Sequence, residues 1–243
     1  MTNDLASLGL DLGDWTSTVE AAVGSTNLAV AGLVRDGQLI QFADPSGAVM
    51  NILTVEPYSV FTGFAGQTMA TGHITMVTDI VALIDIIDDN GYQMASVTAN
   101  LSQGPLLADG EPLQFTPVEL TAIALTDTPY GEAPADATAT VSSPGVDIIA
   151  SGDGSQVPDA AATLAVQIVT ADYRTTELTG QRFIHAVTHA PFPMDLCLPD
   201  APQLPAEGTW VTGRFMLTAS VAQPAVGAGG CGCGGSCGCG GHH

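Results

Sequence analysis

Apolar and polar residues alternate with a period of two along much of the chain, and turn residues interrupt the alternation at short intervals. Such alternation is typical of strands that bury one face. Short stretches of this kind, bounded by Gly, Pro, Asn or Asp, predict strands at residues 27–34, 38–42, 49–55, 58–61 and 92–100. The pairs Asp36-Gly37 and Asn90-Gly91 predict tight hairpin turns between neighbouring strands.

The longest alternating run covers residues 69–87 and is too long for one straight strand, so we expect it to bend or break near Asp79. Further strands are predicted at residues 118–126, 146–150, 161–172, 182–190 and 209–220. No long amphipathic helix separates them. The predicted fold is therefore all-β, an antiparallel β-sandwich or distorted barrel, with a disordered Gly/Cys-rich C-terminal tail.

Three regions are expected along the chain. Residues 1–25 form an acidic N-terminal arm, within which Trp15–Val23 is either a short helix or a first strand. Residues 26–221 form the β domain, with two related halves as an alternative, divided near the Pro- and Ala-rich residues 128–140. Residues 222–243 form a flexible tail of Cys, Gly and His.

The net charge of −21 arises from 25 acidic residues opposed by four arginines and no lysine. This charge repels phosphate backbones and anionic lipids, so neither nucleic acid nor membrane is an expected partner, whereas cations and basic proteins are favoured. No apolar run is long enough to span a bilayer as a helix. The first residues lack the basic and apolar regions of a signal peptide, so we expect a cytoplasmic protein with reduced thiols.

The C-terminal tail concentrates the thiol chemistry, because four of the five cysteines lie within nine residues. Thiolate sulfur and imidazole nitrogen are ligands for soft and borderline metal ions, and glycine gives the backbone freedom to wrap an ion. The predicted ligands are Cys231, Cys233, Cys237, Cys239, His242 and His243. Copper(I) or zinc is the expected metal, with nickel or an iron–sulfur cluster as alternatives.

The Cys-x-Cys-x3-Cys-x-Cys spacing differs from the Cys-x2-Cys knuckles of zinc fingers. It resembles metallothionein clusters and the Cys/His-rich tails of nickel-handling prolyl isomerases, while Cys-Gly-Cys-Gly resembles the C-terminal motif of A-type iron–sulfur carriers. These resemblances imply metal or cluster binding by the tail alone. Alternating Gly, Cys and Ser also resembles a thiazole-forming peptide precursor, which would imply modification at Ser236 and the cysteines. A low-complexity end with incidental thiols is the remaining alternative.

Within the β domain, His185 and His189 are candidate metal ligands, and Cys197 follows them in the sequence. On a helix the pair would lie about 6 Å apart, but on the predicted strand the separation is about 13 Å, too far to chelate one ion. Each histidine then needs a cross-strand partner such as His73, Cys197 or a carboxylate. We expect Cys197 to be a small buried hydrophobic residue, and the Asp-rich residues 147–159 to form a turn rather than a calcium loop.

No catalytic motif is present in the sequence, so we expect a protein that is not an enzyme. The leading hypothesis is a soft-metal-binding protein, acting as metallochaperone, store or scavenger, with the β domain as a docking module for a partner protein. Two alternatives are a structural, self-assembling β protein that forms homo-oligomers and uses the tail as a tether, and a precursor whose Cys and Ser residues are modified.

Truncation after Ala222 tests whether the tail takes part in folding. The deleted segment has no large apolar side chain, and stability in a chain of this size comes from the apolar core. The thermal midpoint of the metal-free truncated protein should equal that of the full chain, measured by calorimetry with a chelator present. A decrease of several degrees would show that the tail packs against the body.

Overall fold

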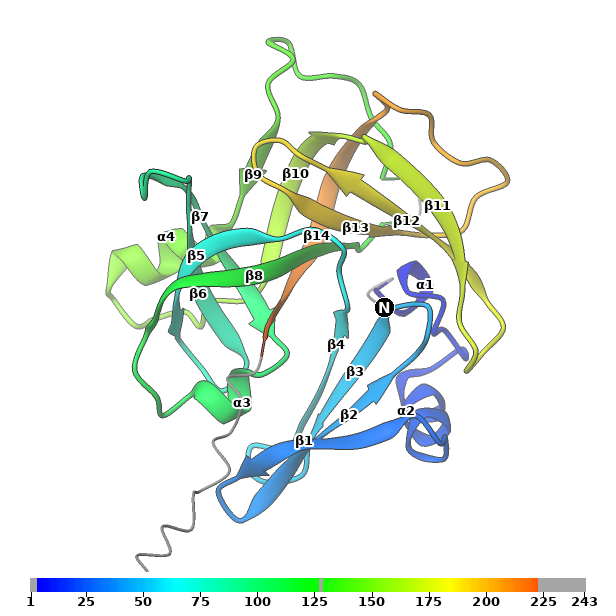
Figure 1. The fold of residues 1–243 in the computed structure, drawn as a ribbon, viewed down its shortest axis with the longest axis vertical. Helices are drawn as coiled ribbons and strands as arrows, with labels where there is room; N and C mark the ends of the chain where they lie inside the picture. The colour runs from blue at the N-terminus through cyan, green and yellow to red at the C-terminus, as the bar shows by residue number, and fades with distance from the viewer. Residues whose placement is uncertain (1–3, 127–128, 223–243) are drawn as a thin grey trace, which may run out of the picture.

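The computed structural model describes residues 4–126 and 129–222. Strands hold 47% of the residues and helices 12%, which confirms the all-β prediction. The strands form two sheets, one of four strands and one of ten, in a sandwich-like arrangement (Figure 1). Nearly all pairings are antiparallel; the two parallel ones join β13 (Met194–Leu198) to β8 (Leu113–Ala124) and β14 (Trp210–Val221) to β7 (Gln93–Leu101).

The smaller sheet is a simple meander in which each strand pairs with the next. Its strands are β1 (Leu28–Val34), β2 (Gly37–Ala43), β3 (Ala48–Leu53) and β4 (Ser59–Phe64). The predicted hairpin at Asp36-Gly37 is confirmed by the pairing of Val34 with Gly37, and Arg35 takes a positive φ of 50° in the turn. The guanidinium of Arg35 then donates to both carboxylate oxygens of Asp79, at 3.0 and 2.7 Å.

The larger sheet folds back on itself through its two twelve-residue strands, β8 and β14, which pair with each other. Its remaining strands are β5 (Ala70–Met76), β6 (Val81–Ile87), β7, β9 (Thr140–Ser142), β10 (Ala161–Gln167), β11 (Thr170–Thr175), β12 (Arg182–Thr188) and β13. The pairings β8–β5–β6–β7–β14–β8 close a ring. β8 precedes and β14 follows residues 128–140, so strands from both sides of that segment share one sheet.

Four helices accompany the sheets: α1 (Asp4–Ser7), α2 (Trp15–Val23), α3 (Gly104–Leu107) and α4 (Pro144–Ser151). Residues 15–23, for which the sequence allowed a short helix or a strand, form helix α2. The Asp14 carboxylate caps this helix by accepting from the Ser17 amide at 2.8 Å. Within the predicted acidic N-terminal arm, Leu5, Leu8 and Leu10 are buried and pack in an apolar cluster of the body. None of the helices in the described ranges combines the length and the apolar character needed to cross a bilayer.

Some predicted strands were wrong in kind or extent. The strand expected at residues 146–150 lies in helix α4, where Pro144 occupies the first turn and Gly152 ends the helix in a left-handed conformation. By contrast, the break expected near Asp79 in the run at 69–87 is confirmed, since residues 77–80 separate β5 from β6. The run at 161–172, predicted as one strand, divides into β10 and β11. β13 was missed because prolines on both sides of the five residues suggested an extended connection.

Three apolar clusters hold these elements together. The largest fills the interior of the ten-stranded sheet and includes Val211, Phe215, Leu217 and Ala219, the residues of β14 expected to face inward. A second cluster lies between the smaller sheet, the N-terminal helices and strands β8, β12 and β13. A third joins one end of β1–β3 to α3 through Leu106. β14 therefore lies at the centre of the fold, since it pairs with β7, β8 and β10 and its side chains belong to the largest apolar cluster.

Leu217→Ala measures how much the fold depends on β14. The side chain is fully buried, so its truncation should lower the free energy of unfolding by about 2–5 kcal/mol through lost burial and a residual cavity. Val157→Ala is the control, since Val157 is 79% exposed and its truncation should change stability by less than about 0.5 kcal/mol. Urea unfolding monitored by circular dichroism gives both values. A loss below about 1 kcal/mol for Leu217→Ala would contradict the central position of the strand.

Candidate functional site

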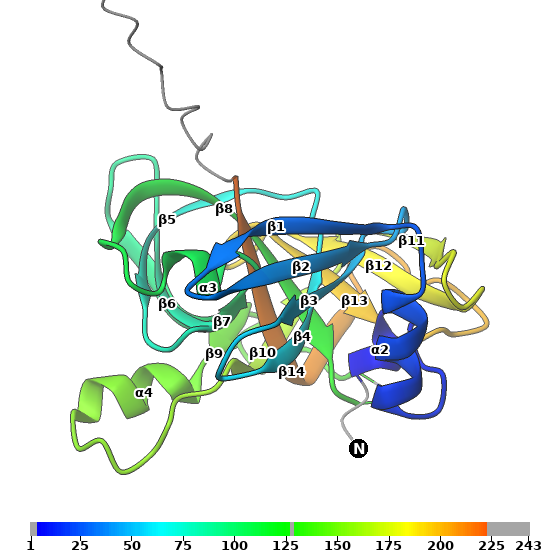
Figure 2. The same cartoon turned by 90° about the horizontal axis from the view of Figure 1, so that it is seen from below.

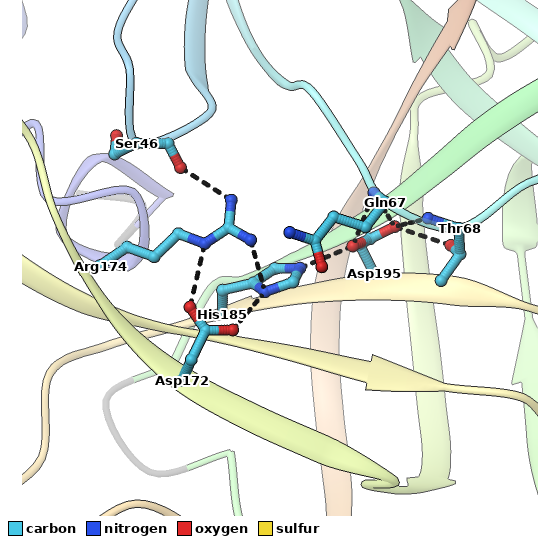
Figure 3. A network of polar contacts seen from close by, with 7 residues as sticks. All are labelled: Ser46, Gln67, Thr68, Asp172, Arg174, His185 and Asp195. Atoms are coloured by element: carbon cyan, nitrogen blue, oxygen red, sulfur yellow. Dashed lines mark hydrogen bonds and ion pairs between the residues drawn. The ribbon is translucent and has the colours of Figure 1, made fainter.

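A polar network centred on the buried His185 joins β11, β12 and β13 (Figure 3). His185 lies on β12 and is 1% exposed. Its Nδ1 is 2.9 Å from Asp172 Oδ1 and its Nε2 is 2.6 Å from Asp195 Oδ1. Because carboxylate oxygens only accept hydrogen bonds, the doubly protonated ring can donate to both of these residues.

Strand register brings these side chains together. Asp172 on β11 lies directly opposite His185, and Cys197 on β13 lies opposite His185 on the other side. Residues that are directly opposite project from the same face of a sheet, and Asp195 shares that face because it is two residues from Cys197. The other face of β12 carries Ile184 and Ala186, which belong to the largest apolar cluster.

Arg174 on β11 connects the network to the smaller sheet. Its Nε donates to Asp172 Oδ2 at 3.1 Å, and its Nη1 donates to the carbonyl oxygen of Ser46 in the β2–β3 turn at 3.0 Å. Its Nη2 lies 3.1 Å from His185 Nδ1. Guanidinium groups only donate, so Nδ1 either donates to Asp172 or, when deprotonated, accepts from Arg174. The ring therefore keeps a partner on Nδ1 in both protonation states.

Phe64, the last residue of β4, provides the aromatic contact between the two sheets. Its ring stacks on His185 with centroids 5.4 Å apart and planes inclined by 23°. The guanidinium carbon of Arg174 lies 5.4 Å from the same ring. An aromatic face attracts cations, so the Phe64 ring stabilises the guanidinium of Arg174 beside it. A residue of the smaller sheet is in this way held against two strands of the larger one.

Asp195 is fully buried and anchors the β4–β5 connection. Its carboxylate accepts from the amides of Gln67 and Thr68 and from the Thr68 hydroxyl, at 2.7–3.1 Å. Burial acts to raise the pKa of Asp195, but the hydrogen bonds from His185, Thr68 and Gln67 outweigh it, so the pKa lies below its ordinary value of 3.8. Gly66 is required beside it, since a Cβ there would lie 2.7 Å from Asp195 Oδ2.

Glu119 on β8 adds a second acidic group near this connection. Its pKa is raised, chiefly by burial and also by the negative charge of Asp195, although a hydrogen bond from the Gly66 amide opposes the shift. The network thus places the His185 ring between two carboxylates, with Arg174 and Glu119 nearby. The His185 ring is 1% exposed and Asp195 is fully buried. The hydrogen bonds of this network therefore connect β11, β12 and β13 with the β4–β5 connection inside the protein.

The remaining candidates in the β domain lie apart from this network. His189 is exposed just beyond the end of β12, and His73 Nδ1 accepts from the amide of Phe115 at 3.2 Å. Cys197 is buried as predicted, and burial raises the pKa of its thiol well above the ordinary value. Asp153 follows α4 and accepts from the Ser155 amide, which lowers its pKa.

The predicted strand at 182–190 is confirmed in β12, as is a carboxylate partner for His185. Within residues 4–126 and 129–222, no three His, Cys, Asp or Glu side chains are grouped to hold a metal ion. The expected tail ligands Cys231, Cys233, Cys237, Cys239, His242 and His243 lie outside the described residues, so their metal binding stays a prediction. Asp172, Asp195 and Arg174 were missed by sequence reasoning, because only the register reveals them.

No protein-family model, curated protein or solved structure matches this chain.

Asp195→Asn tests whether the buried charge pair stabilises the fold. The amide can still accept from Gln67 or Thr68 but removes the buried negative charge toward which His185 and these donors are directed, so we expect a loss of about 3–5 kcal/mol near neutral pH. The folded pKa of Asp195 is depressed, so its contribution is complete above about pH 5 and is lost as pH falls through the folded value. The difference from wild type should therefore shrink in acid.

Asp200→Asn is the matched control for this charge removal. Asp200 pairs with Arg182 at 2.7 Å, but both side chains are substantially exposed, so its loss should cost at most about 1 kcal/mol. Urea unfolding of the three proteins across acidic to neutral pH gives the comparison. Equal effects of the two substitutions at neutral pH would contradict the stabilising role of the buried pair.

Proposed function

We propose that the protein binds a soft metal ion through its C-terminal tail and that the β domain is the folded body that carries and presents this segment. The observation that supports the proposal is the density of thiols, four within nine residues and separated only by Gly and Ser. Thiolates at this density favour Cu(I), Zn(II) and iron–sulfur clusters over hard cations such as Mg²⁺ or Ca²⁺.

The spacing of the thiols favours Cu(I) among these metals. Cys231 with Cys233, and Cys237 with Cys239, each offer two sulfur ligands one residue apart. This arrangement suits the low coordination numbers of Cu(I). Glycines between the pairs would allow the chain to reverse, so that one Zn(II) could take four sulfurs in a tetrahedron. Ni(II) would draw on His242 and His243, whose imidazole nitrogens it accepts more readily than Cu(I) does.

The charge of the whole chain supports the same class of ligand. A net charge of −21 attracts cations to the protein and repels phosphate-bearing partners. The remaining cysteine, Cys197, is buried with a raised thiol pKa, so it would not compete for the ion. A reducing compartment would keep the tail thiols available as ligands. A metallochaperone, store or scavenger fits these properties.

Competition titrations under anaerobic, reducing conditions test the proposal. The expected affinity order is Cu(I) > Zn(II) > Ni(II), and the bound ion should be released as pH falls, because thiolates must lose a proton to bind. Cys233→Ser/Cys237→Ser removes one sulfur from each pair and should weaken Cu(I) binding by at least about a hundredfold. The control Cys197→Ala removes the buried thiol and should leave the affinity unchanged.

Equal Cu(I) affinity in the wild type and the tail variant would exclude the tail thiols as ligands and overturn the proposal. A tail that resists metal and also resists thiol reagents would instead support its chemical modification. Both outcomes are read from the same samples, because thiol titration before metal addition counts the free cysteines.

A further inference from the structure

One face of the four-stranded sheet is uncharged and only partly covered, and it carries a row of apolar side chains together with the polar Gln38. The register aligns Val30, Ile40, Ile52 and Val60 as direct neighbours across β1, β2, β3 and β4. Residues that pair directly project from the same face, so these four β-branched side chains form a row across the whole sheet. Val30 is 56% exposed, and the other three are half-buried.

A second row on the same face lies nearer the hairpin turns. A bulge between Val30 and Gly32 shifts the register of β1, so that Leu33 pairs with Gln38 and shares the face of Ile40. Leu33 is 76% exposed and stands at the β1 edge of the face. At the opposite edge, next to β4, Tyr58 is 72% exposed.

Helix α2 covers only one end of this face (Figures 1 and 2). Val19 of this helix and Leu28, Ile52 and Val60 of the sheet all pack against the second apolar cluster. Beyond the helix, an open groove of 480 Å³ lies between α2 and the β3–β4 hairpin. The groove is lined by Trp15, Ile52, Leu53, Thr54, Tyr58, Ser59 and Val60. The face therefore carries a protruding Leu33 at one edge and an apolar groove at the other.

The two rows and the groove contain no charged residue, in a protein that carries 25 acidic side chains. Acidic residues begin only at the rim, where Asp36 and Glu56 lie in the hairpin turns and are exposed. A basic partner would be attracted to the carboxylate-rich remainder of the surface rather than to this face. Two copies of the chain repel each other elsewhere but can meet here without placing carboxylates in the contact.

We propose that this face of the β1–β4 sheet associates with the same face of a second copy of the chain. A twofold axis parallel to the strands and midway between the faces would exchange β1 with β4 while keeping each row level. Leu33 of each copy would then lie over the groove beside Trp15 and Tyr58 of the other. The row of Val30, Ile40, Ile52 and Val60 would meet its counterpart at the centre, with the two α2 helices at the same end of the contact.

Sedimentation of the full chain with chelator and reductant present tests this proposal independently of metal binding by the tail. Dimerisation should strengthen with salt, because screening at about 0.5 M removes the repulsion between the acidic surfaces and leaves the apolar contact. Leu33→Glu should weaken the dimer at least about a hundredfold, since the symmetric contact contains the substitution twice. Val157→Glu adds the same charge at an exposed residue outside the face and is the matched control.

Trp15 supplies a second readout that locates the contact. In a Trp210→Phe background, which removes the only other tryptophan, Trp15 emission should shift to shorter wavelength as the dimer forms, and Leu33→Glu should abolish the shift. A chain that stays monomeric in high salt overturns the proposal, as does a dimer that Leu33→Glu and Val157→Glu affect equally. A monomer with Trp15 already shielded from quenchers overturns it too, by assigning the face to another part of the same chain.

Discussion

The fully buried charge of Asp195 is the constraint on which the junction of the two sheets depends. A carboxylate without water must be matched by donors, and here the donors come from His185 on β12 and from the amides of Gln67 and Thr68 in the β4–β5 connection. The chain therefore has to pass from the smaller sheet to the larger one directly over Asp195. Arg174 and Phe64 extend the same network to the β2–β3 turn and to the end of β4.

In the described residues, the network at His185 joins strands through the buried His185 and Asp195, with Asp172 exposed at its edge, and the thiol of Cys197 is buried as well. The uncharged face of β1–β4 is directed outward and is suited to protein contact. Four of the five cysteines lie after Ala222, and they are the proposed ligands for a soft metal.

Local patterns in the sequence predicted the hairpins and the class of fold. Asp36-Gly37 and Asn90-Gly91 each mark a turn between paired strands, and the alternation in β14 matches its burial. Residues 146–150 were misread because a short apolar run satisfies both the strand and the helix period. The network at His185 could not be predicted in full, since any of 25 acidic residues could have been the partner and only the register of β11–β13 selects Asp172 and Asp195.

The most direct test of the central claim is the intact mass of the protein purified anaerobically from its own host, recorded under native and then under acidic conditions. Metal binding by the tail predicts a native mass that exceeds the sequence mass by one or more metal ions, and an acidic mass equal to that of the sequence with all five cysteines reduced. A native mass equal to that of the bare chain, or an acidic mass lowered by loss of water and hydrogen from Cys or Ser residues, would contradict it.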